Sequence, residues 1–227
     1  IHEGACRFAA YLAGRGVGPG DKIVLLMGNC PEFLYIFMGA GRIGAVVVPV
    51  NPTLTPEEIV YIASNADATT LVVVPEFVAA LPQFRAALPL VQRVFVLGEA
   101  PVDGAEPFSN LLEPVDHVPA IVATEESDAA LIYTSGTTGL PKGVVLTHRN
   151  YIWNTRMILH SNLWVPEDRF LCILPVFHVN AQVVTLLAPL MGGIDVVLMT
   201  RFNIMGILPL IEKHRITVMS GVPTVYN

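Results

Sequence analysis

The stretch YTSGTTGLPKGVVLTH, residues 133–148, gathers the residue types that bind a phosphate group. Its glycines let backbone N–H groups approach an anion closely, its hydroxyls add hydrogen-bond donors, and its lysine supplies a compensating positive charge. We therefore predict a phosphate-binding loop, called the phosphate loop below. Its candidate binding residues are Thr134, Ser135, Gly136, Thr137, Thr138, Gly139 and Lys142. For any short part of this run, an ordinary glycine-rich turn in a hairpin is the simpler interpretation.

The phosphate loop differs from a Walker loop. That motif has four residues between its two glycines and a Lys-Ser/Thr pair that opens a helix. Here Gly136 and Gly139 enclose two residues, and Lys142 is followed by Gly143 and a β-branched run typical of a strand. Because strands flank the loop on both sides, no helix N-terminus faces the ligand, and hydroxyl groups must supply the missing donors.

A second candidate lies in LPVFHVNAQ, residues 174–182, where Phe177 precedes His178. Taken alone, a histidine in such a run is more often structural than functional. Two further sets of residues carry open alternatives. The cations that could meet phosphates, or else lie on a solvent-exposed helix face, are Lys142, His148, Arg149 and Arg156. The apolar residues that fit a binding pocket or a core equally well are Val179, Ala181 and Val222.

These motifs need a scaffold, and helical patterns alternate with apolar runs along the chain. Buried strands are predicted at residues 22–28, 45–51, 69–74, 93–98, 129–135, 143–148, 169–176, 195–199 and 216–224. Helices are predicted at residues 1–16, 31–44, 55–66, between 74 and 93, from Asn150 onward, and at 180–193 and 204–215. Thr55, Pro56 and Glu58 form the N-terminal signature of the third helix. The strands lack inside–outside alternation, which predicts an α/β fold with mostly parallel sheets covered on both faces.

The order of the elements predicts two lobes. The proline- and acid-rich stretch 98–127 is typical of a surface connection, which places the lobes at residues 1–97 and 128–227. We expect two mostly parallel sheets with flanking helices. The chain begins without methionine inside an apparent helix and stops at Asn227 directly after a predicted strand. We interpret it as part of a longer protein.

Composition excludes several classes of protein. The apolar fraction of 53% with 14% charged residues indicates heavy burial, because the apolar runs are too short or too interrupted to span a membrane. There is no secretory signal pattern. A net charge of -6 argues against a nucleic-acid surface. Cys6, Cys30 and Cys172 are far apart, which favours free buried thiols in a reduced, cytoplasmic setting and predicts no metal site.

A dinucleotide-binding fingerprint is also excluded. The glycines of GRGVGPGD, residues 14–21, suggest such a motif. Counted from Gly14 or Gly16, however, the third glycine position falls on Pro19 or Asp21. A strand pattern also follows where the fingerprint requires a helix.

Taken together, the motifs resemble those of the adenylate-forming superfamily, which includes acyl-CoA synthetases, coumarate-CoA ligases, luciferases and the adenylation domains of peptide synthetases. The phosphate loop resembles the signature loop of that family. LPVFHVNAQ is similar to its aromatic–histidine motif at the acyl pocket, and GVPTVYN, residues 221–227, is similar to the segment beside that pocket. Residues 16–59 resemble the family's N-terminal lobe in order and character.

The resemblance implies an enzyme that uses MgATP to convert a carboxylic acid to an acyl-adenylate and then passes the acyl group to the thiol of coenzyme A. The phosphate loop would hold the β and γ phosphates of ATP, and His178 would be the catalytic residue near the carboxylate. The implied pocket residues are Phe177, His178, Val179, Gly221 and Val222. Amino-acid-activating relatives place an aspartate directly after the phenylalanine. His178 at that position favours an uncharged fatty or aryl acid.

Several parts expected from the resemblance lie beyond residue 227. They are the adenine-recognising segment with the main Mg²⁺-binding glutamate, the ribose-binding aspartate, and the C-terminal lid domain with its catalytic lysine. We therefore expect the 227-residue chain alone to be inactive, with a poorly ordered phosphate loop in the absence of nucleotide. A nucleotide- or acyl-binding pseudoenzyme and an adenylation domain that loads a carrier protein are the alternatives. The sequence leaves the acid, the thiol acceptor and the oligomeric state open.

Overall fold

The computed structural model describes residues 1–98, 102–134 and 139–226. The chain folds as two compact units. The first holds Ile1–Met27 and Pro31–His148, and the second holds Gly28–Cys30 and Arg149–Asn227. The sequence places the division at the connection 98–127, whereas the contacts group the chain as far as His148 with the first unit. The reason is strand pairing, because the strand that follows the connection joins the sheet of the first unit.

A seven-stranded sheet forms the centre of the first unit, in the order β5-β4-β3-β1-β2-β6-β7. The strands are β1 Lys22–Leu26, β2 Val46–Pro49, β3 Ala68–Val73, β4 Arg93–Val96, β5 Glu106–Pro107, β6 Asp128–Thr134 and β7 Lys142–Thr147. All neighbouring pairs run parallel except β6 and β7, which are antiparallel. The mostly parallel sheet predicted from the sequence is therefore confirmed.

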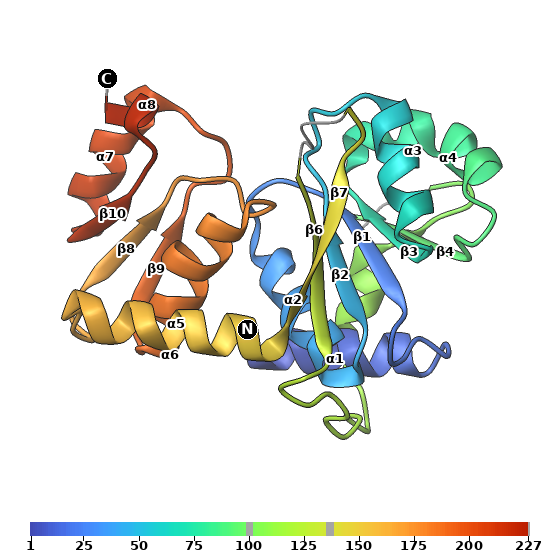
Figure 1. Cartoon of the computed structure of the whole chain (residues 1–227), viewed down its shortest axis with the longest axis horizontal. Helices are drawn as coiled ribbons and strands as arrows, with labels where there is room; N and C mark the ends of the chain where they lie inside the picture. The colour runs from blue at the N-terminus through green and yellow to red at the C-terminus, as the bar shows by residue number, and fades with distance from the viewer. Residues whose placement is uncertain (99–101, 135–138, 227) are drawn as a thin grey trace. The chain divides into compact units, whose positions relative to one another are not determined.

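Helices cover both faces of this sheet. They are α1 His2–Ala13, α2 Pro31–Ile43, α3 Pro56–Asn65, η1 Pro75–Ala80, α4 Leu81–Ala87 and η2 Phe108–Leu112. Figure 1 shows α3 and α4 over one face and α1 and α2 over the other. Ile59 of α3 and Phe84 of α4 share one core cluster with Leu71 and Val94 of the strands. Cover on both faces explains why the strands are continuous apolar runs.

The start of α3 has the local structure that its sequence predicts. The Thr55 hydroxyl accepts a hydrogen bond from the Glu58 backbone N–H at 3.3 Å, and Glu58 Oε2 accepts one from the Thr55 backbone N–H at 2.8 Å. Pro56 occupies the first helical turn. This capping box satisfies backbone donors that have no partner within the helix.

The connection between the predicted lobes contributes to the core. Phe108 and Leu111 of η2 are only 2% and 1% exposed, and the Phe108 ring stacks on Phe8 of α1 at 6.2 Å between centroids. The connection is therefore more than a surface crossing, because η2 fills space beneath α1.

The second unit is built on a three-stranded parallel sheet in the order β10-β8-β9. The strands are β8 Arg169–Cys172, β9 Asp195–Leu198 and β10 Val218–Ser220. The helices are α5 His148–Asn162, η3 Ala181–Leu187, α6 Ala188–Met191, α7 Ile204–His214 and α8 Pro223–Tyr226. A second mostly parallel sheet with flanking helices is thus also confirmed.

Three elements of the second unit differ from the sequence prediction. β8 ends at Cys172 rather than at residue 176. Beyond Cys172 the backbone of Val176 bonds to the side chains of Asn29 and Gln182 instead of to a neighbouring strand. The last predicted strand ends at Ser220, and α8 starts at Pro223, a residue that lacks the N–H a strand needs but suits the first turn of a helix. η3 has π-helical geometry before Pro189, which cannot donate a hydrogen bond to the preceding turn.

β7 is the outermost strand of the larger sheet. Its central residues Val144 and Val145 are 46% and 51% exposed. The strand thus presents apolar side chains at the edge of the sheet. No helix in the described part of the chain combines the length and the apolar character that a membrane span requires.

We predict that Gly39→Ala destabilises the first unit. A Cβ at Gly39 of α2 would lie 2.7 Å from the Ala5 carbonyl oxygen of α1, and a backbone atom cannot move aside. The two helices must separate, which typically costs roughly 1 to 3 kcal/mol. Urea denaturation of the full-length protein measures the change. Gly206→Ala in α7 is the control, because a Cβ there meets nothing closer than 3.6 Å and the alanine should be neutral or stabilising. Equal effects of the two substitutions would contradict this prediction.

Candidate functional site

The phosphate loop joins β6 to β7 in an antiparallel hairpin. Thr134, the last residue of β6, pairs with Lys142, the first residue of β7, and both side chains are exposed. No helix follows the loop directly, as the sequence predicts. Four of the predicted phosphate-binding residues, Ser135, Gly136, Thr137 and Thr138, lie outside the described residues. The expectation of a poorly ordered loop falls on the same residues and is not tested by the structure.

Two glycines shape the described part of the hairpin. Gly139 has a φ of 104°, a backbone conformation that residues with a side chain rarely adopt. A Cβ built on Gly139 would have no other atom within 4 Å. Gly143 pairs with Tyr133 across the two strands, and a Cβ on Gly143 would lie 3.0 Å from the Tyr133 ring. The glycine leaves room for the tyrosine ring to lie across the hairpin.

The loop end of the hairpin is tied to α3. The Tyr133 hydroxyl donates to Asn65 Oδ1 at 2.7 Å, and the Tyr61 hydroxyl donates to the Pro141 carbonyl at 3.3 Å. Burial raises the pKa of Tyr133, and the neighbouring Tyr61 and Asp67 raise it further, so the hydroxyl keeps its proton. Sequence reasoning does not identify Tyr61 and Asn65. Their spacing of four residues on one helix face is the only local signal.

His148 does not suit a phosphate-binding role. Its ring lies against α2, where a Cβ on Gly41 would be 2.8 Å from the ring, and its Nε2 is buried without a hydrogen-bond partner among the described residues. Burial lowers the pKa of His148, which keeps the ring neutral at physiological pH. Arg149 and Arg156 are exposed on α5, as expected for a solvated helix face. Lys142 is therefore the cation that the described hairpin itself presents.

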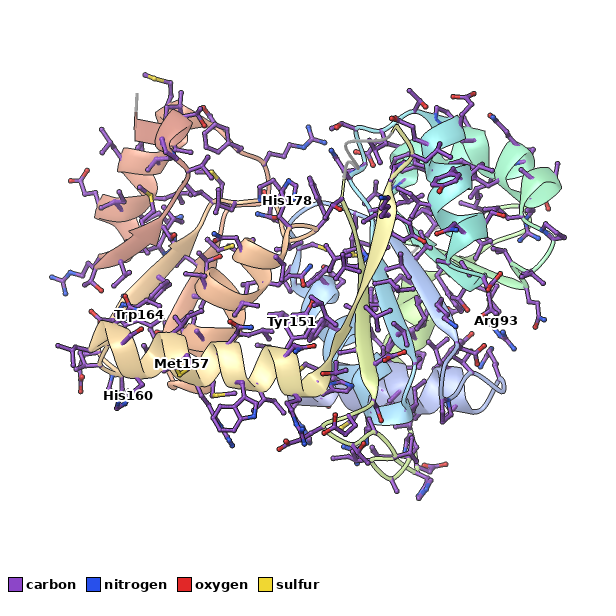
Figure 2. All side chains as sticks on the ribbon, in the orientation of Figure 1. Arg93, Tyr151, Met157, His160, Trp164 and His178 are labelled. Atoms are coloured by element: carbon purple, nitrogen blue, oxygen red, sulfur yellow. The ribbon has the colours of Figure 1, made fainter. Side chains whose placement is uncertain are left out.

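The aromatic–histidine motif follows β8 in the second unit (Figure 2). Val176 is buried, Phe177 is half-buried, and His178 is exposed. The Phe177 and His178 rings lie 4.6 Å apart between centroids. The His178 backbone N–H donates to the Pro175 carbonyl at 3.0 Å, which closes a tight turn. The turn presents an imidazole to the surface next to an aromatic ring.

A buried asparagine shapes the segment that leads into this turn. Asn29, between β1 and α2, donates from Nδ2 to the carbonyl groups of Leu174 and Met199 at 3.0 Å each. Its Oδ1 accepts from the Val176 N–H at 2.8 Å. Asn29 lies 147 positions from Val176 in sequence, and sequence reasoning does not identify it.

The remaining predicted pocket residues divide between surface and core. Val179 and Val222 are 39% and 44% exposed, whereas Ala181 is fully buried in η3. Gly221 is half-buried between β10 and α8. Ala181 is thus a core residue, and the two valines are available to a ligand.

The predicted site residues fall into two groups. The hairpin residues belong to the first unit, and residues 177–179, 221 and 222 belong to the second. Within their groups, the structure brings Thr134 beside Lys142 and Phe177 beside His178. Among the described residues, no three or more His, Cys, Asp or Glu side chains gather in a geometry that would hold a metal ion.

Comparisons with known proteins match the whole chain to one family. The sequence model of the family described as AMP-binding enzyme matches residues 1–227. The curated protein 4-coumarate–CoA ligase 3 of Oryza sativa subsp. japonica is 36% identical over 241 residues, which cover 99% of this chain and 41% of that protein. The chain thus spans about 41% of the length of this relative.

Two solved structures are similar to the whole chain. The anthranilate CoA ligase AuaEII in complex with anthranoyl-AMP has a TM-score of 0.92 at 28% identity, over 99% of this chain and 44% of that one. The inhibitor-bound N-terminal domain of FACL13 from Mycobacterium tuberculosis has a TM-score of 0.89 at 29% identity, over 98% of this chain and 55% of that one.

We predict that Cys172 gives the second unit a pH-dependent stability. Burial raises the pKa of this thiol to about 11, whereas hydrogen bonds with Thr185 and Leu174 lower it by less. The folded state therefore holds the proton more tightly than the unfolded state. The stabilisation is complete below the unfolded pKa of about 8.5 and is lost as the pH rises towards 11.

Urea denaturation should show that wild type loses roughly 2 kcal/mol more than Cys172→Ala between pH 8.5 and 10.5. Other groups that titrate in this range contribute equally to both proteins, so their effect drops out when the changes in unfolding free energy are compared. If both proteins lose stability equally, the thiol is not the source of the effect.

Proposed function

Because the chain belongs to the AMP-binding enzyme family, which its sequence matches from residue 1 to residue 227, we propose that the full-length protein is an acid–thiol ligase. It uses MgATP to convert a carboxylic acid to an acyl-adenylate and transfers the acyl group to coenzyme A. The resemblance found in the sequence is confirmed at the level of the family.

The β6–β7 hairpin is the observation that carries this proposal. Its loop starts and ends at the exposed pair Thr134 and Lys142, and Gly139 adopts a backbone conformation that favours glycine. In the first step a carboxylate must approach a triphosphate, so the site has to offset negative charge. We assign to residues 134–139 and Lys142 the binding of the β and γ phosphates. A lysine charge and backbone donors fit this anion, whereas the described residues offer no metal-binding cluster.

The second half of the proposal concerns the acid. His178 is exposed beside Phe177, at the position where amino-acid-activating relatives carry an aspartate, so this position does not supply a carboxylate for an ammonium group. Val179 and Val222 offer apolar surface. A relative named for 4-coumarate and a structure that contains anthranoyl-AMP support an aryl acid. A solved structure described as a fatty acyl CoA synthetase of Mycobacterium tuberculosis supports a fatty acid instead.

The remaining functions of such an enzyme are assigned to the rest of the full-length protein. The chain spans 41% of the rice relative, and we place the main Mg²⁺ ligand, the adenine and ribose contacts and the lid lysine outside these 227 residues. Mg²⁺ would supply charge neutralisation between the phosphates. On this basis we expect that the chain alone does not form acyl-adenylate. The free thiols of Cys6, Cys30 and Cys172 support a reduced, cytoplasmic setting as part of the proposal. Acyl transfer to coenzyme A, rather than to a carrier protein or to no acceptor, separates the ligase from its two alternatives.

We predict that Lys142→Ala weakens ATP use in the full-length protein. Loss of a hydrogen bond to a charged phosphate typically costs roughly 1.5 to 3 kcal/mol, or about a tenfold to a hundredfold change. ATP–pyrophosphate exchange with a panel of aryl and fatty acids tests the proposed function in wild type and measures this change in the variant. Lys213→Ala, at an exposed lysine in the last turn of α7, is the control. Exchange kinetics within twofold of wild type for Lys142→Ala would rule out its assignment.

We predict that His178→Ala changes the ranking of acids, or the acyl-transfer step, more than the KM for ATP. The reason is that His178 lies beside Phe177 on a surface turn of the second unit, whereas the phosphate loop belongs to the first unit. Steady-state kinetics with several acids measure the change, and His160→Ala on the exposed side of α5 is the control. A change confined to the KM for ATP would assign His178 to the nucleotide instead.

A further inference from the structure

Three polar side chains are buried in the second unit around the aromatic–histidine motif. Tyr151 of α5, Gln182 of η3 and Asn29 are 5%, 1% and 8% exposed. Burying polar groups is costly unless every donor and acceptor finds a partner. Each of these three side chains therefore needs hydrogen-bond partners in the interior of the unit.

The three side chains form a connected path that ends on one peptide. The Tyr151 hydroxyl donates to Gln182 Oε1 at 2.7 Å, and Gln182 Nε2 donates to the Val176 carbonyl at 2.8 Å. Asn29 Oδ1 accepts from the Val176 N–H at 2.8 Å. Both backbone polar groups of Val176 are thus held by side chains.

This arrangement replaces a β-ladder. β8 ends at Cys172, so Val176 has no strand partner, although it is fully buried. Val176 immediately precedes Phe177 and His178, and the turn continues with a hydrogen bond from the Gln182 backbone N–H to the His178 carbonyl at 3.2 Å. The side chain and the backbone of Gln182 therefore hold residues on both sides of Phe177.

The residue types fit these roles closely. Gln182 must accept from Tyr151 and donate to Val176, which an amide does and a carboxylate or thioether of similar size does not. Burial raises the pKa of Tyr151, so its hydroxyl remains a donor. Figure 2 shows Tyr151 on α5 and His178 in the turn after β8.

We propose that Tyr151, Gln182 and Asn29 are positioning residues that fix Val176 and thereby aim Phe177 and His178 at the acid substrate. The role in acid selection rests on the proposed function. None of the three is a catalytic residue, because each acts through the backbone of the turn. Small errors in the placement of reacting groups reduce rates strongly, which makes such rigidity useful.

The kinetic test uses the full-length protein with Tyr151→Phe, Gln182→Met and the double variant. Each single change should lower kcat/KM for the acid by roughly tenfold to a hundredfold, with the KM for ATP within twofold of wild type. The double variant should be no worse than Gln182→Met, because both changes break one path. Additive losses, or equal changes for acid and ATP, would overturn the proposal.

Thr185→Val is the matched control. Thr185 is fully buried on the same helical segment, and its hydroxyl contacts Cys172 Sγ at 3.0 Å and the Ala181 carbonyl at 2.9 Å, but not Val176. It should lower stability without changing the acid kinetics. If it changes them as much as Tyr151→Phe does, general loosening of the unit explains the effect and positioning does not.

Amide hydrogen exchange without substrate keeps the structural claim separate from the proposed function. Exchange of residues 176–182 should accelerate at least tenfold in Tyr151→Phe and Gln182→Met relative to Thr185→Val. If wild type activates no acid, the proposed function fails. The local exchange pattern then tests by itself whether the three side chains fix Val176 and the turn. Unchanged exchange, or acceleration spread through the second unit, would overturn it. Should Gln182→Met not fold, the milder Tyr151→Phe carries the comparison.

Discussion

Backbone N–H and C=O groups that leave a β-ladder need another partner, and both candidate site segments begin where a ladder ends. After β8 the partners are side-chain amides, because Asn29 and Gln182 bind the backbone of Val176. At the loop end of the β6–β7 hairpin the Pro141 carbonyl accepts from the Tyr61 hydroxyl, and the Tyr133 hydroxyl donates to Asn65. In both places polar side chains hold the chain next to the exposed candidate site residues.

The placement of charge is a second constraint on the hairpin. The chain carries a net charge of -6, so a triphosphate would be repelled unless the cation is local. Lys142 lies at the start of an edge strand and is exposed, whereas the ring of His148 is kept neutral by burial. The exposed Lys142 thus places positive charge at the start of β7, whereas the neutral ring of His148 adds no charge where β7 meets α5.

Much of the fold could be predicted from the sequence, because the deciding signals are local. The apolar runs define the parallel strands, and Thr55, Pro56 and Glu58 define the start of α3. The phosphate loop could be proposed because its residue types lie in one continuous stretch, and its binding role stays a prediction. The end of β8 could not be predicted, since the apolar run continues to Val176 while its hydrogen-bond partners come from Asn29 and Gln182. Likewise, η2 lies in an acid- and proline-rich segment, and only the fold shows that Phe108 is buried.

The open edge of the larger sheet affects how the 227 residues behave as a separate polypeptide. Among the described residues β7 is the last strand of the sheet, and it exposes Val144 and Val145. An exposed apolar edge strand is a template for pairing with another molecule. The charge of Lys142 protects only its beginning. Overexpression of this piece alone therefore favours intermolecular strand pairing and insoluble material, and a charged residue at position 144 or 145 is the simplest way to keep it dispersed.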